Sequence, residues 1–279
     1  MLNYLIVDEL IRRALEEDMP FGDITTDTII NEKAESKASV IVKEDGIICG
    51  VSVFDRVYKI LGDVDTRFTV KDGQRVSKND VIGSVSGNTR NILIGERIAL
   101  NLMQRMSGIA TTTNKYSEKI KNFKTQIVDT RKVTPLYRHL DKYSVKCGGG
   151  ANHRFSLSDA VLIKDNHISA AGGVKEAINL ARKNCSFTSK IEVETENSMQ
   201  VLEALEAKAD IIMLDNMTPK EVAEMVEFID GRAIVECSGN ITIDNIEEYG
   251  RAGADFISCG ALTHSFKILD ISLKNLINL

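Results

Sequence analysis

The fold is decided between residues 211 and 239, where the chain reads Ile211-Ile212-Met213-Leu214-Asp215-Asn216, then Pro219 to Ile229, then Ile234-Val235-Glu236-Cys237-Ser238-Gly239. The first and last segments are apolar runs that end in polar residues, as short buried strands do. Between them, apolar residues recur at helical spacing. A strand, a helix and a second strand in this order predict a right-handed crossover connection and a parallel sheet.

The same rhythm extends outward from this stretch and begins near Thr125. Four further apolar runs lead into polar residues: Ile127-Val128, Val161-Leu162-Ile163, Ile191 to Val193, and Phe256-Ile257. Helical patterns fill most of the gaps, as over Gly173 to Arg182 and Ser198 to Ala207. Six clear strands, with a candidate seventh near Ile268 to Ile271, fall short of the eight in a complete barrel. We therefore predict a short or incomplete α/β barrel, with an open doubly wound sheet as the structural alternative.

The first part of the chain has a different pattern. We expect helices over Tyr4 to Leu15, Val51 to Leu61 and Arg90 to Lys119 (the last interrupted at Ser107-Gly108), a strand over Ala38 to Lys43, and short β runs from Phe68 onward. These patterns predict an N-terminal α/β sandwich-like domain with a linking helix over residues 1–110. The barrel, which carries the active site, is predicted over residues 111–279, and packing of the last residues against the first domain is left open.

Composition narrows the classes of function. The chain has 35 Lys and Arg against 40 Asp and Glu, so its net charge of -5 argues against non-specific nucleic-acid binding. No apolar stretch approaches the roughly 20 residues that span a bilayer, and the acidic start does not resemble a signal peptide. Five scattered cysteines without a CxxC motif favour reduced thiols in a cytoplasmic protein over a zinc site or a disulfide framework.

One stretch, Asp129 to Arg154, concentrates cations in this acidic chain and ends with three glycines before His153-Arg154. A bound anion with several negative charges would explain the concentration. The glycines permit close approach of the backbone to a ligand. We expect His153 to be neutral because it lies beside Arg154, and therefore to donate a hydrogen bond rather than act as a base.

Carboxylates and small residues follow other predicted strands. Strand alternation places Glu192 and Glu194 on one face, where an unpaired carboxylate inside a barrel would be costly. Arg131 and Lys164 are the expected neutralising partners, and a purely structural ion network is the alternative for any one of these residues. Ser238-Gly239-Asn240-Ile241 and Cys259-Gly260-Ala261-Leu262 close the last two clear strands and are expected to open helices, which predicts a phosphate site. No clustered His and Cys set implies a tightly held transition metal, whereas Mg²⁺ carried by a phosphorylated substrate is compatible.

Ordered motifs cover nearly the whole chain. They are Glu17-Asp18, Gly22-Asp23-Ile24-Thr25, Gly95-Glu96-Arg97, Leu100-Asn101, Ser107 to Thr111, Asp129-Thr130-Arg131-Lys132, His153-Arg154, Lys164-Asp165-Asn166-His167, Leu214-Asp215-Asn216, Ser238-Gly239 and Gly260 to Ser265. In this order they resemble the quinolinate phosphoribosyltransferase family. The resemblance implies phosphoribosyl transfer from phosphoribosyl pyrophosphate to quinolinate with loss of CO2, in de novo NAD biosynthesis. It also implies an α/β N-terminal domain and an incomplete, roughly seven-stranded barrel.

The resemblance further implies the roles of individual residues. Quinolinate is expected to bind Arg97, Thr130, Arg131, His153, Arg154 and Lys164. Phosphoribosyl pyrophosphate is expected to bind Lys132, Lys164, Glu194, Asp215, Ser238, Gly239, Asn240, Cys259, Gly260 and Ala261. The catalytic residues are expected to be Lys132, Glu194 and Asp215. No metal is tightly held: Mg²⁺ arrives with the donor near Glu194 and Asp215, and no organic cofactor is needed. Arg97 of a neighbouring subunit would complete the site, which implies a homodimer with shared active sites, higher assemblies being left open.

Two departures from the family pattern concern local geometry. Leu136 and Asn240 stand where many members have glycine, and Asn tolerates left-handed backbone geometry. Two other functions also remain open at this point. One is a phosphoribosyltransferase of the same architecture with another acceptor, such as nicotinate or a molybdenum-associated ligand. The other is a non-catalytic phosphometabolite-binding or carrier protein, which the presence of both Glu194 and Asp215 argues against.

Overall fold

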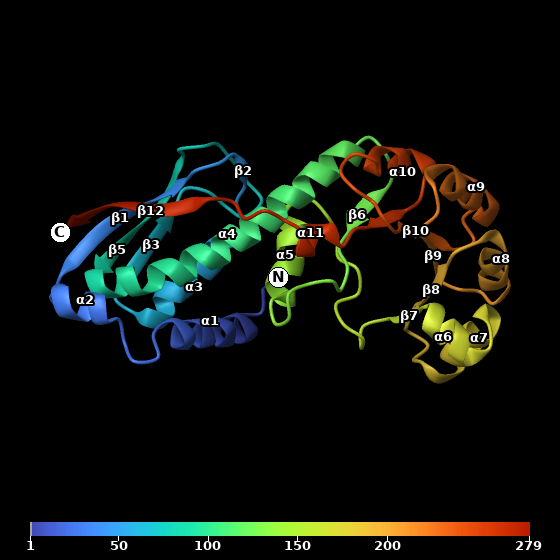
Figure 1. Ribbon diagram of the computed structural model, residues 1–279, viewed down its shortest axis with the longest axis horizontal. Helices are drawn as coiled ribbons and strands as arrows, with labels where there is room; N and C mark the ends of the chain where they lie inside the picture. Colours follow the sequence, from blue (N-terminus) through green and yellow to red (C-terminus); the bar gives the residue numbers. More distant parts are fainter. Residues whose placement is uncertain (1) are drawn as a thin grey trace. The chain divides into compact units, whose positions relative to one another are not determined.

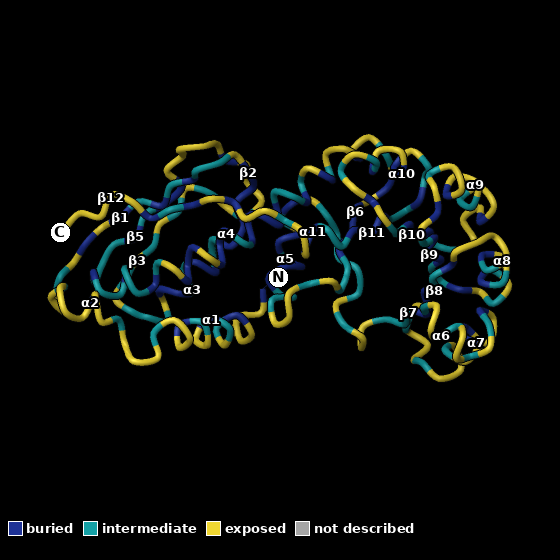
Figure 2. Tube along the Cα trace, viewed as in Figure 1, coloured by how far each residue is buried: buried dark blue, intermediate teal, exposed yellow. Residues whose placement is uncertain are grey.

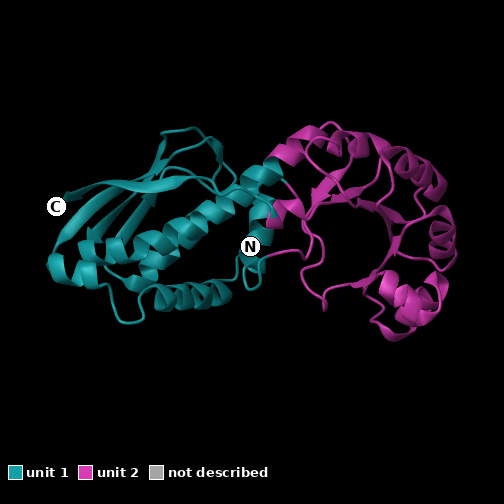
Figure 3. Cartoon of the chain, in the orientation of Figure 1, with its two compact units in different colours: residues 1–114, 134–149, 265–279 teal, residues 115–133, 150–264 magenta. Residues whose placement is uncertain are grey.

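The computed structural model describes residues 2–279, which divide into two compact units (Figure 3). Within the described residues, unit 1 comprises residues 2–114, Thr134–Gly149 and Ser265–Leu279, and unit 2 comprises Lys115–Val133 and Gly150–His264. Each unit has its own sheet. No helix within residues 2–279 combines the length and apolar character needed to cross a membrane.

Unit 1 is built on a four-stranded antiparallel sheet in the order β12-β1-β5-β3 (Figure 1). Its strands are β1 (Glu35–Val42), β2 (Gly46–Ile47), β3 (Val64–Phe68), β4 (Arg75–Val76), β5 (Val81–Asn88) and β12 (Ile271–Asn278), and its helices are α1 (Tyr4–Asp18), α2 (Ile24–Ile29), α3 (Val51–Leu61), most of α4 (Thr89–Ile120) and α5 (Arg138–Cys147). The small strands β2 and β4 pair with each other. The expected helices over Tyr4 to Leu15 and Val51 to Leu61 are confirmed.

Helix α3 forms the centre of the unit 1 core. Its side chains Phe54 and Tyr58 are fully buried, and the ring of Phe54 packs edge-on against Phe68 at a centroid distance of 5.2 Å. Asp72 and Gly62 fix the two ends of the helix. The carboxylate of Asp72 accepts backbone N–H groups at its first turn, and Gly62, with φ of 86°, ends it. The helix is therefore fixed both by apolar burial and by satisfied end groups.

Helix α4 differs from its expected form. It continues without a break from Thr89 to Ile120, whereas the sequence suggested an interruption at Ser107-Gly108. The two residues serve packing instead. Ser107 is buried and bonds the backbone of Cys49, and a Cβ at Gly108 would lie 2.4 Å from the carbonyl oxygen of Lys267. A small residue is needed here because another backbone segment lies against the helix.

Unit 2 is an incomplete α/β barrel, as expected. Its six parallel strands are β6 (Gln126–Val128), β7 (Val161–Ile163), β8 (Ile191–Thr195), β9 (Ile211–Asp215), β10 (Ile234–Ser238) and β11 (Phe256–Ser258). They pair in the order β6-β11-β10-β9-β8-β7, so the first strand joins the last and the circle stays open between β6 and β7. A single bridge from Val128 to Ala151 occupies the open side of β6. The expected seventh strand near Ile268 to Ile271 is wrong, because this segment leads into β12, which pairs with β1 of the unit 1 sheet.

Helices cover the outer side of the curved unit 2 sheet, and their solvent faces are exposed (Figures 1 and 2). They are α6 (Asp165–Ala171), α7 (Val174–Asn184), α8 (Ser198–Glu206), α9 (Pro219–Ile229) and α10 (Ile246–Ala252), while the one-turn helix α11 (Ala261–His264) directly follows β11. Helix α9 has the expected bounds. A capping box between Thr218 and Glu221 and the proline at its first position begin it, and Asp230 in left-handed geometry ends it.

Candidate active site

The carboxyl ends of the unit 2 strands surround a cavity of about 400 Å³. Thirteen residues line it: Thr130, Arg131, Lys132, His153, Arg154, Leu162, Lys164, Glu194, Met213, Asp215, Glu236, Ser238 and Ser258. Most are polar or charged, and they come from strands β7 to β11, from the segments that follow those strands, and from the segments after β6 and α5. Because parallel strands end at the same edge, residues far apart in sequence converge here.

A larger hollow of about 1040 Å³ lies at the opposite ends of the same strands. Residues that begin strands line it, among them Gln126, Ile234 and Phe256. Its charged groups are engaged in the framework: Asp255, for example, accepts the backbone N–H of Val235 and pairs with Lys124. The chemistry of α/β barrels is found at the carboxyl ends of the strands, so the smaller cavity is the candidate site.

Two guanidinium groups lie near each other in this cavity. The pKa of Arg154 is lowered, first by burial and then by the nearby charge of Arg131. Arg154 donates one hydrogen bond to the carbonyl oxygen of Ala160, at 2.9 Å. The Nε atom of Arg131 is buried and has no hydrogen-bond partner among the described residues. Buried donors are normally satisfied, so this atom indicates a missing acceptor.

The position of these cations depends on Asp129, which is fully buried directly after β6. Its carboxylate accepts hydrogen bonds from the side chain of Asn152, at 2.6 Å, and from the backbone N–H of His153, at 3.0 Å. The carboxylate therefore ties the segment after β6 to the segment that carries His153 and Arg154. Sequence reasoning placed Asp129 in a motif but gave it no role.

Two carboxylates lie on the strand ends of β8 and β9. Glu194 forms an ion pair with Lys164, which confirms the expected partner. Asp215 is the last residue of β9 and accepts a hydrogen bond from the side chain of Asn216, at 2.8 Å. No ion pair to Asp215 is found within the described chain, so its charge remains available to a ligand.

His153 lies between two buried carboxylates. Its Nε2 atom is 3.2 Å from Glu192 and 3.3 Å from Glu236. Burial alone would lower the pKa of His153, but the hydrogen bonds and charges of the two glutamates outweigh burial and raise it to about 10. The pKa of Glu192 is also raised, chiefly by its burial. The expectation of a neutral ring is therefore wrong, because two carboxylates outweigh the single neighbouring guanidinium.

This triad predicts a stability that decreases at alkaline pH. The folded protein binds the proton of the His153 ring more tightly than the unfolded chain does. The stabilisation that His153 gives the fold is therefore complete below its ordinary pKa of 6.5 and is lost as the pH rises to about 10. One pKa unit corresponds to about 1.4 kcal/mol. The urea midpoint of unfolding should therefore fall across this range, and Glu236→Gln should flatten the decrease. Exposed Glu227→Gln is the control, and an unchanged pH slope in Glu236→Gln would contradict the assignment.

The two small-residue segments differ from each other. Cys259-Gly260 leads directly into α11, as expected, whereas residues 239–245 form a loop before α10, so the expectation that Ser238-Gly239-Asn240 opens a helix is wrong. Gly239 and Asn240 both have positive φ, of 95° and 52°. A Cβ at Gly239 would lie 2.2 Å from the side chain of Asn216. The loop therefore exposes backbone next to Ser238, where a side chain would not fit.

Nine of the predicted site residues line the cavity together, and the others lie elsewhere. Gly239, Asn240, Cys259, Gly260 and Ala261 directly follow the lining residues Ser238 and Ser258. Arg97 is exposed on α4 in unit 1, where it lines another hollow with Asp18 and Asp23.

Sequence reasoning missed Leu162, Met213, Glu236 and Ser258. The signal for Glu236 was present, since it interrupts the apolar run Ile234-Val235-Glu236-Cys237 as Glu192 interrupts its own strand.

Comparison with known proteins agrees with the fold and the motifs. The quinolinate phosphoribosyl transferase N-terminal domain model matches residues 23–107, and the C-terminal domain model matches residues 109–274. A probable nicotinate-nucleotide pyrophosphorylase (carboxylating) of Methanocaldococcus jannaschii is 46% identical over 274 residues, or 95% of each protein, and the Bacillus subtilis protein of that name is 39% identical over 98% of this chain and 94% of its own. The crystal structure of NadC from Streptococcus pyogenes superposes with a TM-score of 0.97 at 40% identity, covering 100% of this chain and 99% of that one. This chain therefore belongs to the quinolinate phosphoribosyltransferase family, because both domain models of the family match it and its relatives match nearly its whole length.

Proposed function

We propose that the chain transfers the phosphoribosyl group of phosphoribosyl pyrophosphate to the ring nitrogen of quinolinate and releases CO2. The products are nicotinate mononucleotide and pyrophosphate, in the de novo synthesis of NAD. The relatives from Methanocaldococcus jannaschii and Bacillus subtilis are named for this carboxylating pyrophosphorylase, and a Nicotiana glauca relative is named a decarboxylating quinolinate phosphoribosyltransferase. The enzyme is a decarboxylating pentosyltransferase, and we propose that it works in the cytoplasm.

The observation that carries the proposal is the unpartnered Nε of Arg131 beside the second guanidinium of Arg154. Two like charges close together in a half-buried site repel each other, and the carboxylates of a bound ligand would relieve that repulsion. Quinolinate is a planar dicarboxylate, and guanidinium groups bind carboxylates through paired hydrogen bonds. We assign its carboxylates to Arg131 and Arg154, with Thr130, His153 and Lys164 completing the wall of the cage.

The donor is assigned to the other side of the cavity. Lys132 is exposed there and provides a cation for the pyrophosphate. Glu194 and Asp215 provide carboxylate oxygens for the ribose hydroxyls and for the Mg²⁺ that the donor carries, which fits the preference of Mg²⁺ for oxygen ligands. The segments Ser238-Gly239-Asn240 and Cys259-Gly260-Ala261 are assigned to the 5′-phosphate, because backbone N–H groups in such segments bind anions.

These residues act on charge as it develops. The ring nitrogen of quinolinate forms a bond to the ribose C1 while the bond from C1 to the pyrophosphate oxygen breaks. Positive charge then builds on the ribose ring, where the carboxylates of Glu194 and Asp215 stabilise it. Lys132 compensates the negative charge of the leaving pyrophosphate. The new bond makes the ring nitrogen cationic, so it stabilises the electron pair that the departing CO2 leaves on the adjacent ring carbon, and a proton then takes the place of the lost carboxylate on that carbon.

A competition assay tests the acceptor. The purified protein with Mg²⁺ and phosphoribosyl pyrophosphate should form nicotinate mononucleotide from quinolinate with release of one CO2 per product, and an equal concentration of nicotinate should not compete. Preferential use of nicotinate without CO2 release would identify the alternative acceptor. Absence of product from either acceptor, at high enzyme concentration, would contradict the enzymatic proposal.

Gly239→Ala is predicted to weaken donor binding. The new Cβ would meet the side chain of Asn216 in a backbone conformation with φ of 95°, which costs a non-glycine residue about 1–3 kcal/mol. We expect the KM for phosphoribosyl pyrophosphate to rise on the order of tenfold, with little change in the affinity for quinolinate. Gly231→Ala is the matched control, because Gly231 also has positive φ but has no atom within 4 Å of the position that its new Cβ would take. An equal rise in both variants would contradict the phosphate assignment.

We also propose a homodimer with shared active sites, in which Arg97 of a second copy completes the quinolinate cage. Its exposure on α4 is compatible with that role. Mixing an Arg97→Ala variant with an Arg154→Ala variant should restore activity, because hybrid dimers would contain one intact site. Native mass spectrometry verifies that hybrids form. Hybrids that form but remain as inactive as either parent would argue against shared sites.

A further inference from the structure

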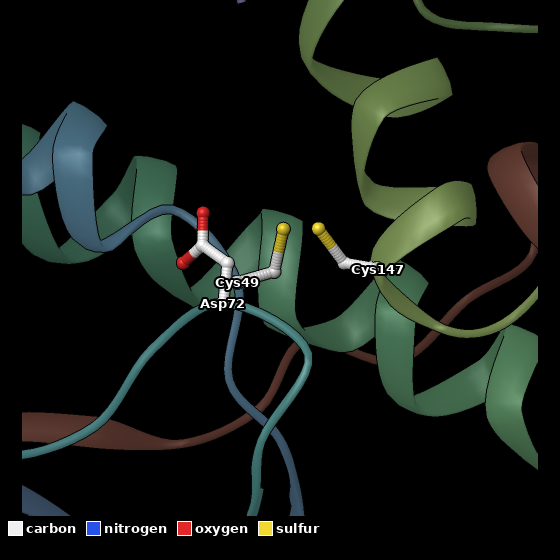
Figure 4. Close-up of side chains that lie close together, drawn as sticks. All are labelled: Cys49, Asp72 and Cys147. Atoms are coloured by element: carbon white, nitrogen blue, oxygen red, sulfur yellow. The ribbon is translucent and has the colours of Figure 1, made fainter. Parts of the chain in front are cut away.

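A cluster of reactive side chains lies in unit 1, and none of its residues lines the proposed active site. The sulfur atoms of Cys49 and Cys147 and a carboxylate oxygen of Asp72 lie within 4.8 Å of one another. Figure 4 shows the two sulfur atoms next to each other. Nothing in the proposed reaction uses these three residues.

The two cysteines are brought together by firmly held backbone. Cys49 precedes α3 and is fully buried; its N–H donates to the hydroxyl of Ser107 at 2.9 Å, and that hydroxyl donates back to its carbonyl oxygen at 3.0 Å. Cys147 ends α5 and is partly exposed. The next residue, Gly148, leaves no room for a Cβ, which would lie 2.4 Å from the carbonyl oxygen of Ala110. Both chain segments are therefore fixed, and the packing of the unit holds the two sulfur atoms close together.

A metal ion is not the best explanation of the cluster, because Asp72 is already in use. Its Oδ1 accepts the backbone N–H groups of Gly50 and Val51, both at 2.9 Å, and its Oδ2 accepts the hydroxyl proton of Tyr143, at 2.8 Å. The carboxylate thus begins α3 and anchors α5. Zinc sites normally supply four ligands, whereas this cluster offers only two sulfur atoms besides the carboxylate that is already in use.

We propose that Cys49 and Cys147 are a modification site, a thiol pair that closes into an intramolecular disulfide when hydrogen peroxide oxidises the protein. The thiolate of one cysteine attacks the peroxide, which breaks the O–O bond and leaves a sulfenic acid and water. The second thiol then attacks that sulfur, so an S–S bond forms, the S–O bond breaks and a second water leaves. Two electrons pass from the sulfur atoms to the peroxide, and both thiol protons end in water.

Ionisation and access select the order of events. A hydrogen bond from the Cys49 thiol lowers the pKa of Cys147, whereas burial raises the pKa of Cys49 well above its ordinary value. Cys147 is also the more exposed of the two, so it is the residue that meets the peroxide first. Cys237 and Cys259 are buried, and burial raises the pKa of both, to about 12 for Cys237. They are therefore poor competitors for the oxidant.

The test uses the full chain, treated with hydrogen peroxide and then unfolded in an alkylating agent. Intact mass should show the alkylatable thiols falling from five to three, and peptide mapping should find Cys49 joined to Cys147. Dithiothreitol should restore all five. Cys185→Ser, which removes a partly exposed cysteine outside the pair, should still form the link, and Cys147→Ser should not.

Other results would overturn the proposal. One is oxidation of Cys147 to a sulfinic or sulfonic acid while Cys49 remains alkylatable. Another is a link that joins either residue to a different cysteine. Binding of one Zn²⁺ per chain that is lost in Cys147→Ser and that protects both thiols from alkylation would assign the cluster to a metal instead.

Discussion

Arg131→Ala is expected to weaken quinolinate binding on the order of 10²- to 10³-fold, as measured by calorimetry without the donor. Loss of one member of a buried charge pair costs about 2–5 kcal/mol, because the partner charge is left unpaired. Arg131 is the most informative residue of the proposed quinolinate cage to substitute. Its Nε has no hydrogen-bond partner among the described residues, so the substitution breaks no hydrogen bond of that atom. Arg154, by contrast, also supports the carbonyl of Ala160.

Two further variants separate charge from geometry. Arg131→Lys retains a positive charge but loses the planar fork, so it should recover only part of the affinity. Arg251→Ala removes a guanidinium that is mostly exposed on α10, and it should bind quinolinate as the unmodified chain does. An unchanged quinolinate affinity in Arg131→Ala would contradict the assigned cage.

Asp215→Asn is expected to lower kcat on the order of 10²-fold and to change quinolinate affinity little. The substitution keeps the size of the side chain and removes the charge that is assigned to the ribose ring and to Mg²⁺. Asp215 forms no ion pair within the described chain, so no partner cation is left behind, as Lys164 would be after a change at Glu194. The readout is the rate of nicotinate mononucleotide formation at saturating substrates.

Asp230→Asn is the matched control for Asp215→Asn. Asp230 makes the same change from carboxylate to amide at an exposed position that has left-handed geometry, which Asn tolerates. Its kcat should stay within about twofold of the unmodified value. If both variants retain full kcat, Asp215 has no electrostatic part in the reaction.

Much of the fold followed from periodicity in the sequence. Helix α9 could be predicted with its correct bounds because its cap, its proline and its apolar spacing agree. The strand near Ile268 to Ile271 was assigned to the wrong sheet, because its apolar pattern fits either sheet. Only pairing with β1, which precedes it by most of the chain, decides between them. Long-range pairing leaves no local signal.

The candidate site was partly predictable for a similar reason. The concentration of cations from Asp129 to Arg154 suggested one anion site, yet its two ends line the cavity while its middle forms α5 in the other unit. The density of charge along the sequence does not show which of the charged residues belong to a helix that lies outside the cavity. The raised pKa of His153 was missed because it depends on Glu192 and Glu236, which are adjacent only in the folded barrel.

The departures from the family pattern have a backbone explanation. Leu136 and Asn240 both have positive φ, of 71° and 52°. Glycine adopts this geometry without strain, which accounts for the glycines that other members have there. Asn240 fits at little cost, as expected, whereas Leu136 keeps its exposed side chain in a conformation that is strained for leucine.

Because β12 pairs with β1, the unit 1 sheet cannot be completed on the ribosome until β12 has been synthesised. Strand β1 ends at Val42, but the strand that covers its edge begins only at Ile271 and is therefore synthesised much later. Until then the nascent N-terminal sheet carries an unpaired edge, which is a template for association with other chains. The barrel strands, whose neighbours mostly follow one another directly in sequence, face no such delay. Nascent chains stalled before Ile271 should therefore be the ones that need protection by a chaperone.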